Sequence, residues 1–181
     1  MKIRRVVAGT GPDGKAQVIM DGPAQRSVEF SSAPGLAAAL VWSAQAGASI
    51  PRADEVADRT ADVDFVPGPG EALLMIATYP PDSSMMRADF DAVAFGGEFA
   101  SLLPGLAETF ESDHPGMHTT HSIDYSVVLE GEITLELDDG QEVLLGKHDV
   151  MVQHGNRHAW RNKSDQPATM LFVLMGGRKT P

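Results

Sequence analysis

The run from Gly116 to Gln166 constrains the fold most, because it contains no proline and repeatedly alternates apolar and polar residues. The alternation is most regular from Ser122 to Leu129, which predicts a strand with Asp124 on one face and Tyr125 on the other. Gly131 interrupts this pattern, and a second strand follows over 133–137. Asp138-Asp139-Gly140 is a strong hairpin turn. Further strands are predicted over 142–145, 150–153, 158–162 and 169–175.

The N-terminal part predicts a more irregular set of elements. Short β-prone runs at 3–8 and 16–20 flank the turn sequence GTGPDGK and predict a hairpin, and a third run covers 27–30. The alanine-rich segment 36–45 fits either a strand or a short helix. A long surface connection with room for a helical turn is predicted over 48–70, followed by a buried strand over 72–79. Residues 99–110 predict one or two short helical turns, broken at Pro104-Gly105.

Many short strands in 181 residues predict one all-β domain, a sandwich or barrel. A formal charge of −11 argues against nucleic acid or an anionic membrane as partner. The chain has no cysteine, so any transition metal must be held by histidine and carboxylate. No stretch is long and apolar enough for a signal or membrane span, and a cytoplasmic location is expected.

All six histidines lie between His114 and His158, within the β-type part of the sequence. Neutral imidazole is the commonest metal ligand in proteins, and strands hold ligands rigidly. Strand alternation puts His118, Thr120 and Asp124 on the same face, and His121 on the opposite one. His158 and Trp160 also share a face. The sequence therefore predicts a metal or small-molecule site built on strands.

The same residues resemble the cupin superfamily, whose members are small jelly-roll β-barrels. Five residues separate His118 from Asp124 and six separate Asp124 from Gly131, which is the register of the first cupin motif. The second motif, a histidine, three residues and an asparagine, is matched by His158 and Asn162. The sequence HTTHSIDYSVVLEGE followed by VMVQHGNRHAWRN is similar to that of a bacterial and fungal group of cupins largely without an assigned reaction.

Two departures from the superfamily pattern bear on its four-ligand site. Thr120 stands where the motif has its second histidine, and Asp124 replaces the usual glutamate. The resemblance implies an all-β, cupin (RmlC-like) jelly-roll barrel with an elaborated N-terminal half and one or two short helices. Residues 1–181 would form a single cupin domain, with N-terminal strands and loops over 1–114 and the motif core over 115–177.

The predicted metal ligands are His118, Asp124 and His158, two histidines and one carboxylate, the set that non-haem Fe(II) enzymes use. Fe, Zn, Mn and Ni all suit such ligands. A bulge before Ser122 would turn His121 inward as a further ligand. Asp124 has an alternative role in orienting the ligands, and a metal-free pocket with hydrogen-bonded histidines is the alternative for the whole site.

The predicted substrate pocket adds four residues, namely Thr120, Ser126, His154 and Trp160. Trp160 fits a pocket floor and a packed core equally well. His114 and His148 are expected in loops or turns, and Asn162 is expected to support neighbouring backbone.

Two functions follow as hypotheses. The first is a metal-dependent enzyme acting on a small oxygenated organic acid or an aromatic-derived metabolite, as a lyase or isomerase or as an oxygenase. The second is a metal-free cupin that binds or senses a small molecule without catalysis. In either case the resemblance implies a homodimer paired through N-terminal strands, with a small-molecule ligand and no nucleic-acid or membrane partner.

Overall fold

The computed structural model describes residues 1–47 and 49–178, and these form an all-β fold with short helical additions. The eleven strands of this part of the chain are β1 (Arg4–Thr10), β2 (Ala16–Pro23), β3 (Arg26–Glu29), β4 (Ala37–Gln45), β5 (Glu71–Tyr79), β6 (Ser122–Glu130), β7 (Glu132–Glu136), β8 (Glu142–Gly146), β9 (Val150–His154), β10 (Ala159–Arg161) and β11 (Ala168–Gly176). Helix α1 covers Ala92–Leu102, and 3₁₀ turns lie at η1 (Asp82–Ser84), η2 (Ala107–Thr109) and η3 (Asp138–Gly140).

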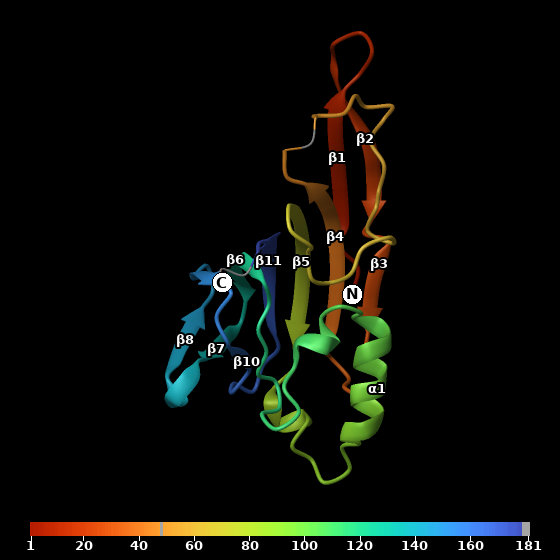
Figure 1. The fold of residues 1–181 in the computed structure, drawn as a ribbon. Coiled ribbons are helices and arrows are strands. Elements are labelled where there is room, and N and C mark those ends of the chain that lie inside the picture. The colour runs from red at the N-terminus through yellow and green to blue at the C-terminus, as the bar shows by residue number, and fades with distance from the viewer. Residues whose placement is uncertain (48, 179–181) are drawn as a thin grey trace.

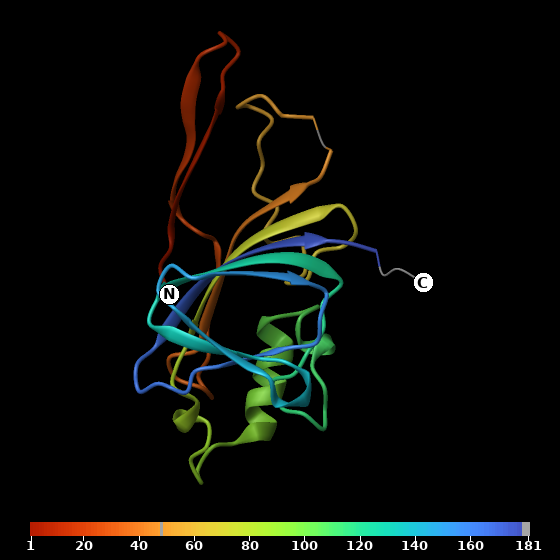
Figure 2. The same cartoon turned by 90° about the vertical axis from the view of Figure 1, so that its left-hand side faces the viewer.

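The strands pair antiparallel in three sheets. The largest has the order β3-β4-β5-β11-β6-β9, a second has the order β10-β7-β8, and β1 pairs with β2 alone. The N-terminal strands β4 and β5 thus join the same sheet as β11 and β6 near the C-terminus (Figure 1). Both views show the β1–β2 hairpin projecting away from the rest of the molecule (Figure 2).

The apolar core lies between the two larger sheets. Val128 of β6, Leu135 of β7 and Met170 of β11 are fully buried, and their burial follows the alternation along each strand. Gly131 makes the tight connection from β6 to β7 at φ +75°, where a side chain would also meet the carbonyl oxygen of Pro167. Only glycine fits this position without strain.

The strand predictions are confirmed, and the ambiguous run 36–45 is a strand, β4. The hairpin turn at Asp138-Asp139-Gly140 is confirmed as the connection between β7 and β8. In the described part of the 48–70 connection there is no helical segment. The short helical turns predicted over 99–110 are present as the end of α1 and as η2, but the prediction missed the part of α1 from Ala92 onward. Gly96 and Gly97, poor helix formers, concealed its first turns.

Helix α1 is held at its start and at its middle. The carboxylate of Asp91 caps it by accepting from the amides of Val93 and Ala94 at 3.1 and 2.9 Å. Glu98 accepts hydrogen bonds from the backbone amides and the hydroxyls of Ser31 and Ser32, in the loop between β3 and β4. These bonds lower the pKa of Glu98 to about 2. The carboxylate therefore ties α1 to the end of the large sheet.

A buried ion pair fixes the base of the projecting hairpin. The Arg5 guanidinium bonds the carboxylate of Asp58 and donates to the carbonyl oxygen of Val41 at 3.0 Å. It also lies over the Trp42 ring, 5.3 Å from the centroid. Arg5 thereby joins β1 to β4 and to the 48–70 connection. Among the helices of the described residues, none is long and apolar enough to cross a membrane.

Candidate functional site

His118 and His158 pair directly through their backbones, just before β6 and β10. The His118 amide donates to the carbonyl oxygen of His158 at 2.9 Å, and the His158 amide donates back at 3.0 Å. Because the backbones pair, the two imidazole centroids lie 4.2 Å apart. Both side chains line one large cavity. The fold thus brings the two histidines predicted as metal ligands side by side.

The two imidazoles are oriented alike by backbone carbonyl groups. Nδ1 of His118 lies 3.1 Å from the carbonyl oxygen of Gly116, and Nδ1 of His158 lies 3.0 Å from that of Asn156. A carbonyl oxygen only accepts, so Nδ1 carries the proton in each neutral ring and Nε2 keeps its lone pair. Metal-ligating histidines are usually fixed by such a bond from the second nitrogen.

Burial keeps both imidazoles neutral. Desolvation, helped by the adjacent His158, lowers the pKa of His118 to about 4, against the opposing effect of the bond to Gly116. Desolvation also lowers the pKa of His158. Both rings are therefore uncharged near neutral pH, the form in which imidazole donates to a metal ion.

Strand β6 and the residues before it direct a row of polar side chains inward. Thr120, Ser122, Asp124 and Ser126 are each at most 5% exposed, whereas His121 and Tyr125 between them are exposed. The Ser122 hydroxyl donates to Thr120 Oγ1 at 2.9 Å. Burial raises the pKa of Asp124, and the hydroxyls of Ser122 and Thr120 oppose that shift. The alternation inferred from the sequence therefore gives the correct faces.

Gln153 is a site residue that the sequence reasoning missed. It lies on β9 directly opposite Asp124 on β6, is 2% exposed and lines the same cavity. Within the described structure, both side-chain amide atoms of Gln153 and Oδ1 of Asp124 are shielded from solvent without a hydrogen-bond partner. The pairing of β9 with β6 could have indicated Gln153, because it lies opposite Asp124. However, the apolar residues Val150 and Val152 suggest that their own face of β9, and not that of Gln153, is the buried one.

The cavity has a volume of about 1400 Å³ and opens among β4, β5, β10, β11 and the segment that carries α1. His118, Thr120, Asp124, Gln153, His158 and Trp160 line its polar part. Every phenylalanine of the chain also lines it, namely Phe30, Phe65, Phe90, Phe95, Phe99, Phe110 and Phe172. Few of these residues are close in sequence, so the pocket is assembled by the fold.

Aromatic rings run without a break through the site. From Phe90 on one side to Phe172 on the other, consecutive ring centroids lie between 4.2 and 5.9 Å apart. Phe110 stacks on His118 at 4.5 Å with an angle of 20° between the planes. Trp160 meets His158 edge-on, at 5.7 Å. The histidine pair thus lies in the middle of a wall of aromatic surface.

The remaining predicted site residues lie outside the cavity. His121 and His154 have exposed side chains, and neither lines the cavity. Ser126 is fully buried on the inward face of β6 but is not part of the cavity wall. His148 is exposed in a turn with φ +74°. Asn162, by contrast, lines the cavity and supports backbone as expected, donating to the carbonyl oxygens of Tyr79 and Gln166 at 2.9 and 2.8 Å.

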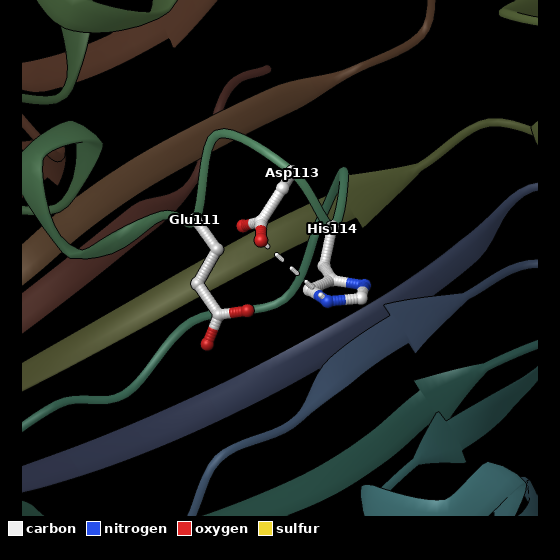
Figure 3. A group of neighbouring side chains, drawn as sticks. All are labelled: Glu111, Asp113 and His114. Atoms are coloured by element: carbon white, nitrogen blue, oxygen red, sulfur yellow. Dashed lines mark ion pairs between the residues drawn. The ribbon is translucent and has the colours of Figure 1, made fainter.

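Glu111, Asp113 and His114 form a group of acidic and histidine side chains in the loop between η2 and β6, with Glu111 half-buried and the other two exposed (Figure 3). In these three residues, the carboxylate oxygens and the imidazole nitrogen that could bind a metal all lie within 4.8 Å of one another. Among the described residues, the corresponding atoms of His118, Asp124 and His158 do not form such a group. The figure shows Asp113 directed toward His114, and Oδ2 of Asp113 lies 3.8 Å from Nε2 of His114. Glu111 is already paired with Arg157 through two hydrogen bonds of 2.6 Å, which lower its pKa.

The sequence similarity of this chain to known proteins includes the segment that carries the histidine pair. Residues 107–174 match the Cupin domain family. Phomopsin biosynthesis cluster protein D of Diaporthe leptostromiformis is 52% identical over 60 residues, 33% of this chain and 32% of the relative. Cupin-domain-containing oxidoreductase virC of Hypocrea virens is 39% identical over 62 residues, again 33% of this chain and 32% of the relative. The chain thus matches about a third of each relative's length.

Among solved structures, a putative ethanolamine utilization protein Q of Salmonella typhimurium is similar over 98% of this chain and 99% of its own, with 11% identity and a TM-score of 0.43. The Cupin_2 domain of an XRE family transcriptional regulator from Enterobacter cloacae covers 59% of this chain and 83% of its own, with 18% identity and a TM-score of 0.37. Residues 107–174, which include the histidine pair, Asp124 and Gln153, are thus a cupin domain built on antiparallel sheets.

Proposed function

We propose that the chain is a metal-dependent oxidoreductase that acts on an oxygenated organic molecule in the cavity of His118 and His158. The observation that carries the proposal is the paired imidazoles, each with Nδ1 directed at a backbone carbonyl oxygen and Nε2 left to bind. The names of similar proteins, such as the virC oxidoreductase, favour redox chemistry over a lyase or isomerase.

The donor chemistry of the cavity residues suits a divalent ion. His118 and His158 supply two neutral nitrogen donors, and the buried Oδ1 of Asp124, which has no hydrogen-bond partner in the described structure, supplies an oxygen donor from the same cavity. When bound, such an ion supplies a Lewis acid and, if redox-active, a centre for electron transfer to or from the substrate. Two histidines and one carboxylate leave room for a substrate oxygen.

The surrounding side chains position the substrate. The Gln153 amide can both donate to and accept from a substrate carbonyl or hydroxyl group, opposite Asp124. Phe110 and Trp160 flank the histidine rings and exclude water from them.

The second candidate function is metal-free binding of a small molecule. It is favoured by Thr120, where the cupin motif has a histidine, and by the ligand atoms of His118, Asp124 and His158, which do not all lie within 4.8 Å of one another in the described structure. In that function the same polar groups would hydrogen-bond the ligand directly.

We also propose that residues 1–181 work as one cupin domain. β4 and β5 from the N-terminal half pair in the same sheet as β11 and β6, and Phe30, Phe65 and Phe90 from that half line the cavity beside the histidine pair. A site completed by both halves would be lost on separating them.

Titration of chelator-treated protein with Co(II), followed by visible absorption, tests the metal proposal. We expect saturation at one ion per chain, and loss of the signal in His118→Ala and His158→Ala. His154→Ala is the matched control, because that side chain is exposed and outside the cavity. Equal signals in all four proteins would overturn the assignment. Loss of the Co(II) signal only in an Asp113→Asn, His114→Ala double variant would instead assign the ion to the group of Glu111, Asp113 and His114.

A further inference from the structure

The composition of the cavity wall indicates what it binds. All seven phenylalanines of the chain, with Trp160 and Tyr79, line this one space. Three of the phenylalanines, Phe90, Phe95 and Phe99, come from the segment around α1. Concentrating the aromatic residues in this way provides a large apolar contact surface. At about 1400 Å³, the cavity exceeds the usual range of about 300–1,000 Å³ for small-molecule sites.

The charges of the wall argue against an acidic ligand. Arg161 and Lys163 are the two arginine or lysine residues on the described lining, and both are paired. Arg161 Nε lies 2.5 Å from Glu136, and Lys163 Nζ lies 2.5 Å from Glu142. The lining also carries five acidic residues, Asp82, Glu111, Asp124, Glu136 and Asp165. A ligand carboxylate would have to compete with Glu136 and Glu142 for these two cations and would be repelled by the other acids of the lining.

The polar end of the cavity suits an uncharged oxygen. Gln153 is 2% exposed, and its amide lines the cavity without a partner in the structure as described. An unpaired buried amide gains most from a ligand that supplies a hydroxyl or carbonyl group. Phe110, stacked on His118 at 4.5 Å, places the aromatic wall against the histidine pair of the same cavity.

We propose that the cavity binds a large, uncharged, fused-ring aromatic or similarly apolar molecule, with one hydroxyl or carbonyl group at Gln153 and Asp124 and its rings along the phenylalanine wall. The proposal deepens the proposed function, on which it rests for the location of the site. It selects the aromatic-derived class of substrate over the small organic acids.

Two adjacent glycines of α1 provide a matched pair of variants. An added Cβ meets nothing within 4 Å at either Gly96 or Gly97, and both residues are exposed and helical. Gly96 lines the cavity and Gly97 does not. Leucine at either position improves helix propensity equally, but only at Gly96 does it take up cavity space.

Fluorescence titration of chelator-treated protein with hydroxymethylanthracene, anthracene carboxylate and malonate at about pH 8, where both acids are ionised, tests the proposal. We expect the alcohol to bind about tenfold more tightly than the matched carboxylate, and malonate not to compete. Gly96→Leu should weaken binding of the alcohol at least about fivefold, while Gly97→Leu and His154→Ala should not.

Equal or tighter binding of the carboxylate, failure of the alcohol to bind, or equal weakening by the two leucine variants would overturn the ligand class. Circular dichroism of each variant confirms that it is folded. Because no metal is present in the assay, its outcome is separate from the Co(II) titration. Binding of hydroxymethylanthracene without Co(II) uptake would refute the metal-dependent function and support the ligand class. Co(II) uptake without binding of hydroxymethylanthracene would support the metal-dependent function and refute the ligand class.

Discussion

Asp124 of β6 and Gln153 of β9 face each other across an antiparallel strand pair, and Oδ1 of Asp124 and both amide atoms of Gln153 have no hydrogen-bond partners among the described residues. Buried polar groups of this kind are costly unless something pairs with them. Both residues line the cavity that also contains the histidine pair. The fold thus maintains, at a cost in stability, a polar surface that a bound molecule can complete.

Replacing Gln153 by leucine should separate stability from binding. Leucine removes two unpaired polar atoms at a position that is 2% exposed, so we expect the free energy of unfolding to rise by about 1–2 kcal/mol. Binding of hydroxymethylanthracene should weaken in the same variant. Denaturant unfolding and fluorescence titration measure the two effects. Gln17→Leu, on the exposed face of β2, is the control. A destabilised variant that binds normally would refute the role of Gln153.

The clamp between Glu98 and the Ser31-Ser32 loop should control how firmly α1 covers the cavity. Glu98→Gln removes the charge that holds four hydrogen bonds, so amide hydrogen exchange within Ala92–Leu102 should accelerate. Glu108→Gln, on η2, provides a neighbouring acidic control.

The same clamp should respond to pH. The pKa of Glu98 falls from an unfolded value of 4.5 to about 2 in the folded protein, so its stabilising effect is complete above 4.5 and is lost as the pH falls toward 2. The exchange rates of wild type and Glu98→Gln should therefore converge in that interval. A difference between them that persists unchanged to pH 2 would contradict the clamp.

The Arg5–Asp58 pair should stabilise the base of the β1–β2 hairpin. Hydrogen bonding to Arg5 is the main cause that lowers the pKa of Asp58 from 3.8 to about 2, which corresponds to about 2 kcal/mol at neutral pH. Because the folded pKa is the lower one, this contribution is present above pH 3.8 and is lost as the pH falls to 2.

Asp58→Asn should therefore lower the free energy of unfolding at pH 7, and the difference from wild type should shrink at acid pH. Thermal unfolding between neutral and acid pH measures it. Asp54→Asn, whose partner Arg52 is 3.9 Å away and exposed, should change stability by less than about 0.5 kcal/mol. An equal effect of the two substitutions would show that the Arg5 pair has no special role.

The sequence predicted the strands and the histidine pair because alternation determines both. Even spacing places His118, Thr120 and Asp124 on one face, and burial in the structure follows that parity, with His121 turned outward. The strands of the motif core could also be predicted because the turns between them are short and contain glycine.

The cavity could not be predicted from local patterns. Phe30, Phe65 and Phe172 line one cavity with residues of α1 only because the fold brings distant segments together, and no short stretch of sequence records that. Gln153 was missed because Val150 and Val152, which are exposed, look like the buried face of β9. Gly96 and Gly97 concealed α1, which is stabilised by Asp91 and Glu98 rather than by helix propensity.

The most direct test of the central claim is the metal content of protein purified without chelator or added metal, measured by elemental analysis. The account predicts close to one Fe, Mn, Zn or Ni per chain, with loss in His118→Ala and His158→Ala and retention in His154→Ala. Less than about a tenth of an ion per chain, with no uptake on reconstitution, would contradict it and favour metal-free binding.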